Sequence, residues 1–131
     1  MLKEAKIKYI GPREAELLED YKIVLHVLTK SGGHDYISLT IPKGFRFDGA
    51  TVPPVIDKII GIDRWGRHLP AALIHDYIYV NEGRIGGRIF TRKFADKLLR
   101  QHLKEYKYKP YQYNLAYYYC RVLGYVLWRE L

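Results

Sequence analysis

The first half of the chain alternates apolar and polar side chains every second residue, a pattern typical of half-buried β-strands. Two runs rich in β-branched residues, 21–29 and 35–42, flank a pair of glycines and predict a β-hairpin. Every other residue from Ile37 to Ile41 is apolar, so we expect one buried face in the second strand. Pro42 should end this strand, because proline cannot donate to a sheet ladder.

Three shorter segments surround this hairpin. The stretch K-I-K-Y-I, residues 6–10, predicts another strand. The stretch G-F-R-F-D-G, residues 44–49, predicts a short strand with Phe45 and Phe47 pointing to one side. For E-A-E-L-L-E-D, residues 14–20, we expect a turn of helix or a loop.

The second half of the chain changes to helical spacing. It predicts helices from Leu69 to about Val80, from Thr91 to about Leu103 and from Pro110 to about Arg129. The sequence Asn81-Glu82-Gly83 is a suitable C-terminus for the first, and R-I-G-G-R-I-F (84–90) is a loop or a small ribbon. The third helix is apolar nearly all round, so we expect it to be the central core helix. Its many tyrosines, together with Arg121, argue against a membrane span.

These elements predict an α+β fold, with a small N-terminal antiparallel β-sheet followed by three C-terminal helices. At 131 residues the chain fits one domain, 1–131, without internal repeats or linkers. In the third helix Ala116, Cys120 and Gly124 form a stripe of small side chains that would let another helix approach closely.

Charge is distributed unevenly along the chain. Residues 1–83 hold 11 basic and 11 acidic side chains, whereas residues 84–131 hold 11 basic and 3 acidic ones, which accounts for the whole net charge of +8. This predicts either an anionic partner, such as nucleic acid or a membrane surface, or an ordinary solvated face. Eight tyrosines lie between 106 and 125, among the cations Lys104, Lys107, Lys109 and Arg121. They could stack bases while the cations hold phosphates, or they could pack into the core.

A single cysteine, Cys120, cannot form an intrachain disulfide, and the charged N-terminus lacks a signal core. We therefore expect an intracellular, reducing setting without secretion by a signal peptide. Two asparagines, two glutamines and one methionine beside many lysines and isoleucines are typical of heat-adapted proteins.

The stretch A-L-I-H-D-Y-I-Y, residues 72–79, sets two ionisable groups in an apolar run. They form either a hydrogen-bonded pair at a helix edge or a functional site. Neighbours on a helix do not face each other, so His75 shares a face with Tyr79 while Asp76 points to a flank, where a metal or an arginine could meet it. The carboxylates that could orient His75 are Asp48 and Asp96.

Each of these carboxylates has an ordinary explanation as well. Asp96 has Arg92 and Arg100 four residues away on either side, which is also the pattern of a helix salt-bridge ladder. Asp48 precedes a glycine and could simply form a turn.

Four motifs in order resemble the domain of unknown function 1353 family, small proteins frequent in phages and other viruses. They are G-F-R-F-D-G-A-T-V-P, A-L-I-H-D-Y-I-Y, R-K-F-A-D-K-L-L and a tyrosine-rich helix with Gly124 and Trp128, and they cover about residues 44–129. The resemblance implies a viral context, in the host cytoplasm or the virion, and another viral protein as a possible partner. It supplies no activity, but it groups Asp48, His75, Asp76, Arg92 and Asp96 into one candidate constellation.

H-D-Y-I-Y alone is similar to the H-D-x-C-Y stretch of secreted phospholipases A2. This similarity implies His75 as general base, Asp76 as calcium ligand, Asp96 as orienter of the histidine and Tyr79 as a supporting hydroxyl. Ile78 stands where that family has cysteine, and no glycine calcium loop precedes the helix.

Together these residues predict a hydrolase-like site. A divalent metal such as calcium or magnesium on Asp76 and Asp48 would stabilise an oxyanion while His75 takes a proton from water. Zinc is poorly supported, because a zinc site needs further histidines and only His68, seven residues before His75, is placed to be a companion ligand. The alternative is a non-enzymatic virion, assembly or nucleic-acid-associated protein that uses its basic, tyrosine-rich C-terminal third.

Overall fold

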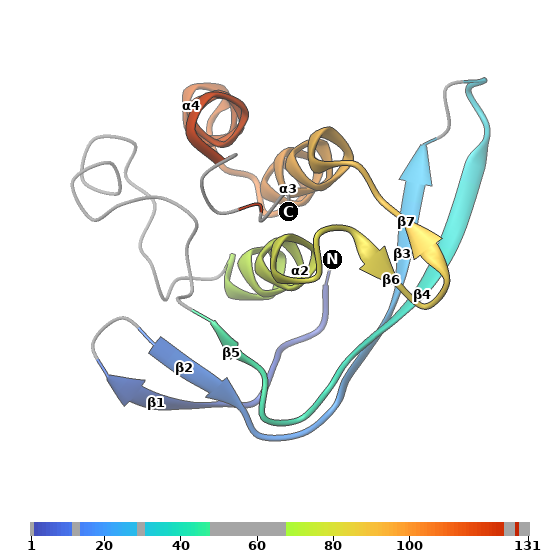
Figure 1. The fold of residues 1–131 in the computed structure, drawn as a ribbon. Coiled ribbons are helices and arrows are strands. Elements are labelled where there is room, and N and C mark those ends of the chain that lie inside the picture. The colour runs from blue at the N-terminus through green and yellow to red at the C-terminus, as the bar shows by residue number, and fades with distance from the viewer. Residues whose placement is uncertain (1, 12–13, 29–30, 48–67, 125–127, 129–131) are drawn as a thin grey trace.

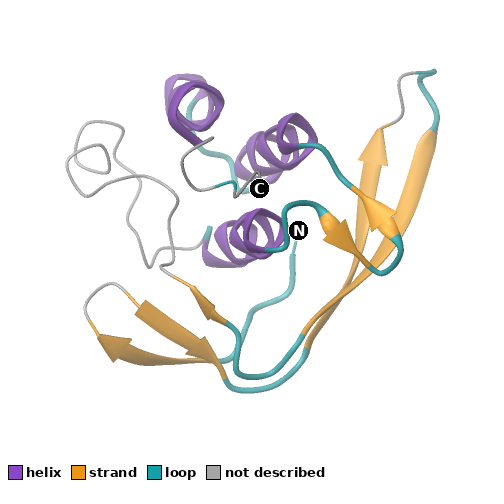
Figure 2. Ribbon diagram, viewed as in Figure 1, coloured by secondary structure: helices purple, strands orange, loops and turns teal. Residues whose placement is uncertain are grey.

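The computed structural model describes residues 2–11, 14–28, 31–47, 68–124 and 128. The strands are β1 (Ile7–Gly11), β2 (Glu14–Leu17), β3 (Tyr21–Leu28), β4 (His34–Ile41), β5 (Arg46–Phe47), β6 (Arg84–Ile85) and β7 (Arg88–Ile89). The helices are α2 (Leu69–Val80), α3 (Arg92–Glu105) and α4 (Pro110–Leu123). The fold is α+β, as predicted, with the helices gathered on one side of the strands (Figures 1 and 2).

The N-terminal strands form two small antiparallel sheets rather than one. β1, β2 and β5 make a three-stranded sheet with β2 in the middle, and β3 pairs only with β4. The expectation of a helical turn or loop at residues 14–20 is wrong for 14–17, because β2 occupies them. Ala15 and Leu17 point into the core while Glu14 and Glu16 point outward, a two-residue period that the acidic composition had hidden.

The β3–β4 hairpin confirms the alternation in the sequence. Its register runs from the pair Tyr21 and Ile41 to the pair Leu28 and His34 without a bulge. In β4, Ile37, Leu39 and Ile41 are buried, and the residues between them are exposed. Of the strand predicted at 44–49, β5 occupies Arg46–Phe47, and residues 48–49 lie outside the described residues. The rings of Phe45 and Phe47 stack 6.2 Å apart. Residues 84–89 form the small ribbon β6–β7.

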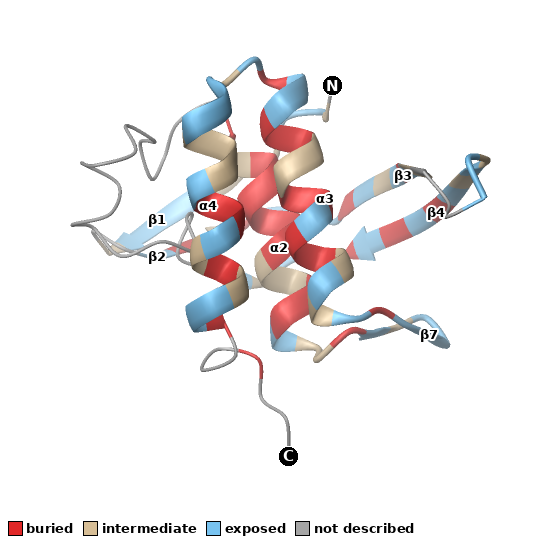
Figure 3. Cartoon of the chain, turned by 90° about the horizontal axis from the view of Figure 1, so that it is seen from above, coloured by how far each residue is buried: buried red, intermediate tan, exposed pale blue. Residues whose placement is uncertain are grey.

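The central helix is α2 and not the third helix, which corrects the expectation from hydrophobicity. Eight of the twelve residues of α2 are buried, and the helix lies between the strands and the other two helices (Figures 1 and 3). On α4 only Ala116, Tyr117 and Cys120 are buried. α4 spans Pro110–Leu123 with Gly124 as its C-cap, and the expected end of the helix at about Arg129 lies outside the described residues. Trp128 lies in a bend against Tyr79. Among the described residues, no helix has the length and apolarity that crossing a membrane requires.

The ends of the helices agree with the sequence signals. The Thr91 hydroxyl caps α3 by accepting a hydrogen bond from the Phe94 amide at 3.0 Å. α2 ends at Val80, and the turn that follows it closes at Gly83, whose φ of 77° lies in the left-handed region. The Gly83 amide donates to the Ile78 carbonyl at 2.9 Å, and its own carbonyl accepts from the Phe90 amide at 2.7 Å. Gly83 thereby fixes the exit of α2 and the start of the connection to α3.

A matched pair of glycine substitutions tests this turn. Gly83 and Gly87 have φ of 77° and 79°, but a Cβ on Gly83 would overlap the Phe90 carbonyl and reach 3.0 Å from the Trp128 ring, whereas at Gly87 nothing lies within 4 Å. We expect Gly87→Ala to cost about 1–2 kcal/mol, the ordinary strain of a left-handed alanine, and Gly83→Ala to cost at least ~3 kcal/mol. Urea unfolding measures both values. Equal losses would show that the Phe90 contact is unimportant.

Candidate functional site

A buried carboxylate, Asp96, joins the three helices. It lies in the first turns of α3 with 0% of its surface exposed. Its Oδ1 accepts from the Tyr79 hydroxyl at 2.5 Å and from His75 Nε2 at 2.8 Å, both on α2. Its Oδ2 accepts from Arg121 Nη1 of α4 at 3.0 Å and lies 3.6 Å from Arg92 Nη1. Both oxygens are therefore supplied with donors, as a buried charge requires.

The protonation states of this network follow from its contacts. Burial by itself raises the pKa of Asp96. The hydrogen bond and charge of His75 act in the opposite direction, as do the hydrogen bonds from Tyr79 and Arg121, and together they lower the pKa below its usual range. The pKa of Tyr79 is raised, mainly by burial and then by its bond to the Asp96 carboxylate. An ionised Asp96 therefore faces a neutral phenol. Because a carboxylate only accepts, the hydrogen of the His75 bond belongs to Nε2.

Arg92 ties α3 to the end of α4. Its Nη1 donates to the Cys120 carbonyl at 2.6 Å, and its Nη2 donates to the Arg121 carbonyl at 3.2 Å. These carbonyls belong to the last turn of α4, where a cation is favourable. The predicted salt-bridge ladder is thus only half formed, since Arg100 lies over the Tyr117 ring at 3.8 Å from its centroid.

Gly124 gives the network the space that it needs. A Cβ at this position would come within 2.6 Å of the Tyr79 hydroxyl and 3.1 Å of Arg92 Nη1. Ala116 and Cys120, the other small residues of the predicted stripe, are 3% and 0% exposed. The stripe therefore permits the close approach that the sequence suggested, and it does so at Asp96.

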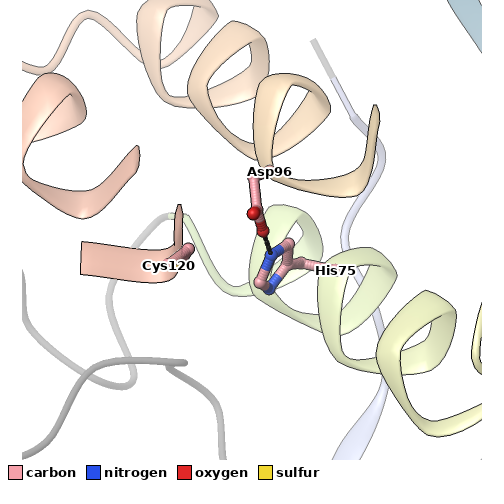
Figure 4. A group of neighbouring side chains, drawn as sticks. All are labelled: His75, Asp96 and Cys120. Atoms are coloured by element: carbon pink, nitrogen blue, oxygen red, sulfur yellow. Dashed lines mark hydrogen bonds and ion pairs between the residues drawn. The ribbon is translucent and has the colours of Figure 1, made fainter. Parts of the chain in front are cut away.

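His75, Asp96 and Cys120 also lie close enough to hold a metal ion, with one potential ligand atom of each within 4.8 Å of the others (Figure 4). The charges argue against this use. Two guanidinium groups already lie at Asp96 Oδ2. The pKa of the Cys120 thiol is raised, first by burial and then by the charges of Asp96 and Asp76. A metal needs the thiolate, so these three residues fit a charge-compensated network better than a metal site.

The other predicted site residues are spread around this centre. Asp76 is half-buried on α2, and its charge is one of the causes that raise the pKa of Cys120. Asp48 lies outside the described residues. His68 Nδ1 lies 3.2 Å from the Tyr108 hydroxyl. The catalytic and metal-binding roles of all these residues stay predictions.

The predicted anion-binding cations divide into two groups. Lys104, Lys107 and Lys109 are exposed at the connection between α3 and α4. Arg121 instead turns inward to Asp96, and its side chain is 28% exposed. Sequence reasoning missed this pairing, although Arg121 is the only charged residue of α4. A lone charge in an otherwise uncharged helix is a signal for a buried partner.

Comparison with known families matches residues 24–120 to DUF1353, described as a protein of unknown function. That description names no activity, source or substrate. No curated protein and no solved structure matches the chain. The matched segment contains His75, Asp96 and Cys120, together with α2, α3 and most of α4, and it ends one residue before Arg121.

We expect Asp96→Asn to destabilise the protein by about 3–5 kcal/mol at neutral pH, because it leaves Arg121 without its buried counter-charge. Tyr79→Phe removes one donor and should cost about 1–3 kcal/mol. Guanidinium unfolding at several pH values measures both losses.

The pH dependence of these losses identifies Asp96 as the charged group. Its folded pKa lies below the unfolded value of about 3.9, so its stabilisation is complete above that value and is lost as the pH falls through the folded pKa. The gap between wild type and Asp96→Asn should therefore be constant above about pH 5 and shrink below about pH 4. A gap that stays constant to about pH 2 would contradict an ionised Asp96.

Proposed function

Because the chain belongs to the DUF1353 family of proteins of unknown function, we propose its activity from the site itself: a hydrolase-like reaction with His75 as general base and Asp96 as its orienting carboxylate. The observation that carries this proposal is the 2.8 Å hydrogen bond between His75 Nε2 and a fully buried carboxylate. Such a bond fixes the tautomer and orientation of an imidazole and stabilises the imidazolium that forms during proton transfer.

The rest of the network supports this division of roles. Because Nε2 carries the hydrogen of the bond to Asp96, Nδ1 is the only ring nitrogen through which His75 could take up a proton. Arg121 and Tyr79 keep Asp96 ionised, so that the proton stays on the imidazole and is not passed to the carboxylate. His75 is 1% exposed, so substrate reaches it only after the side chains that cover it have moved.

A divalent cation such as calcium or magnesium on Asp76 and Asp48 would supply the electrophile of this reaction. Asp76 is half-buried on α2, one residue from His75, which is consistent with this role. Asp96 is not a ligand in this scheme, because its oxygens are already occupied by His75, Tyr79 and Arg121. The substrates that suit such a site are carboxylic esters and phosphoesters.

Hydrolysis of p-nitrophenyl acetate, p-nitrophenyl butyrate and bis(p-nitrophenyl) phosphate, each with calcium, magnesium or a chelator, tests this proposal. His75→Gln should lower kcat/KM by a factor of about 10²–10⁴, the usual contribution of a general base. His102→Gln is the matched control, since His102 is also a buried histidine (3% exposed) and its Nδ1 has no hydrogen-bond partner among the described residues. It should change kcat/KM only a few-fold.

The same preparations separate catalysis from stability. Metal at about a hundred times its dissociation constant should stabilise the wild type by ~2.7 kcal/mol, and Asp76→Asn should abolish this shift. If the wild type hydrolyses none of the substrates and His75→Gln only unfolds earlier, the His75–Asp96 pair is structural and the enzymatic proposal is wrong.

A second candidate function, binding of nucleic acid, rests on the three exposed lysines between α3 and α4. Lys107 adopts a φ of 61° there, which turns the chain between the two helices. Lys104 Nζ lies 5.2 Å from the centre of the Tyr113 ring, an arrangement of cation and aromatic ring that also suits a nucleotide.

Titration of duplex DNA tests this second candidate. Three phosphate contacts should weaken binding about 40-fold between 50 and 200 mM salt. Replacing Lys104, Lys107 and Lys109 by alanine should remove that dependence. The matched control replaces the exposed Lys8, Lys22 and Lys43, with the same change in net charge, and should keep most of the affinity. Equal losses in the two triple variants would indicate only a general effect of charge.

A further inference from the structure

The outer face of α4 is apolar although it is exposed to solvent. Every exposed residue of this helix is uncharged and apolar or aromatic: Pro110, Tyr111, Leu115, Tyr118, Val122 and Leu123. The polar residues of the helix are half-buried against the rest of the protein. Surface helices ordinarily carry their charges on the outer face, so α4 has the pattern of a helix that is covered on two sides.

The size of this face is sufficient for an interface. Tyr111, Leu115, Tyr118 and Val122 are exposed to 52%, 46%, 58% and 67%. With Leu123 they present on the order of 500 Å² of apolar surface, which is toward the upper end of the ~300–600 Å² covered by the largest patch of a typical monomer, a patch that is often functional. Two such faces together would bury about 1,000 Å², the lower limit for a specific interface.

The spacing of the four side chains points to a second copy of the same chain as the partner. Tyr111, Leu115, Tyr118 and Val122 follow one another at intervals of four, three and four residues, the seam spacing of paired helices. The intervals of four, three and four residues read the same from either end of the helix. A two-fold axis between Leu115 and Tyr118 therefore places Leu115 opposite Tyr118 of the partner, and Tyr111 opposite Val122 of the partner, so that each large ring faces a smaller side chain.

Charge selects the antiparallel arrangement. The exposed lysines Lys104, Lys107 and Lys109 lie at the N-terminal end of α4. A parallel pair would bring the two lysine groups together, whereas an antiparallel pair separates them by roughly 21 Å, the length of a 14-residue helix. This distance exceeds the Debye length of about 8 Å at physiological salt. The face itself holds no exposed cation, so it does not suit phosphate groups.

We propose that the protein forms a symmetric dimer in which the outer faces of two α4 helices pack antiparallel. The dimer explains why a helix whose exposed residues are all apolar or aromatic lies at the surface of a single copy. It does not depend on the proposed activity, because the residues of the seam are not those of the His75–Asp96 network. It places α4 between two cores, with Ala116 and Cys120 facing its own chain and Leu115 and Tyr118 facing the partner.

Sedimentation equilibrium over about 1 to 100 µM protein tests the proposal. The wild type should have twice the 15.5 kDa mass of one chain. Leu115→Glu and Tyr118→Glu should be monomeric, with unchanged circular dichroism. Ile89→Glu is the control, since Ile89 is 80% exposed on β7 and lies outside the seam, and it should remain dimeric. A monomeric wild type, or a dimer that survives Leu115→Glu, would overturn the proposal.

Crosslinking tests the direction of the pairing. A mixture of Leu115→Cys and Tyr118→Cys chains should form a disulfide between the two variants under mild oxidation, while each variant alone should crosslink far less. Parallel pairing would instead join identical positions. The wild type controls for Cys120, which is fully buried. Crosslinks mainly within each single variant would refute the antiparallel arrangement.

A monomer that binds anionic vesicles through this face would replace the dimer by a membrane partner.

Discussion

The structure depends on the burial of one carboxylate. Asp96 has no exposed surface, and an ion in that position is tolerated only when each of its oxygens has donors. The donors come from two other helices, His75 and Tyr79 on α2 and Arg121 on α4. The relative positions of α2, α3 and α4 are therefore fixed by the need to satisfy a single side chain, and the close packing at Gly124 follows from the same requirement.

This network also explains why a chemical role and a structural role are hard to separate in this protein. The contacts that would orient His75 as a base are the same contacts that stabilise the ionised Asp96. Any variant of the pair changes both the geometry of the imidazole and the free energy of unfolding. The buried His102 serves as a comparison. Burial lowers its pKa to about 4, and its Nδ1 has no hydrogen-bond partner among the described residues. His102 is therefore merely buried, whereas His75 is held in a defined tautomer.

Local signals in the sequence predicted the elements well where patterning and caps agreed. The two-residue alternation predicted the hairpin, and the proline predicted the start of α2. The Thr91 hydroxyl predicted the cap of α3, and the glycine predicted the turn at Gly83. The strand at 14–17 was missed because two glutamates obscured its alternation. The position of α4 was predicted wrongly because the hydrophobicity of a helix does not show which other part of a protein packs against it. The meeting of Arg121 with Asp96 joins residues 25 positions apart, and no local pattern encodes such a distance.

The link from Arg92 to the last carbonyls of α4 has a consequence for the order of folding. α2 and α3 can meet early, because a short ribbon connects them, but their pairing alone buries Asp96 with His75 and Tyr79 and without a guanidinium from α4. Such a two-helix intermediate carries an incompletely compensated charge, which raises its free energy. The arrival of α4 removes that penalty and contributes the carbonyls that Arg92 binds. We therefore expect the docking of the helices to be cooperative for an electrostatic reason, with the last helix completing the core rather than merely covering it.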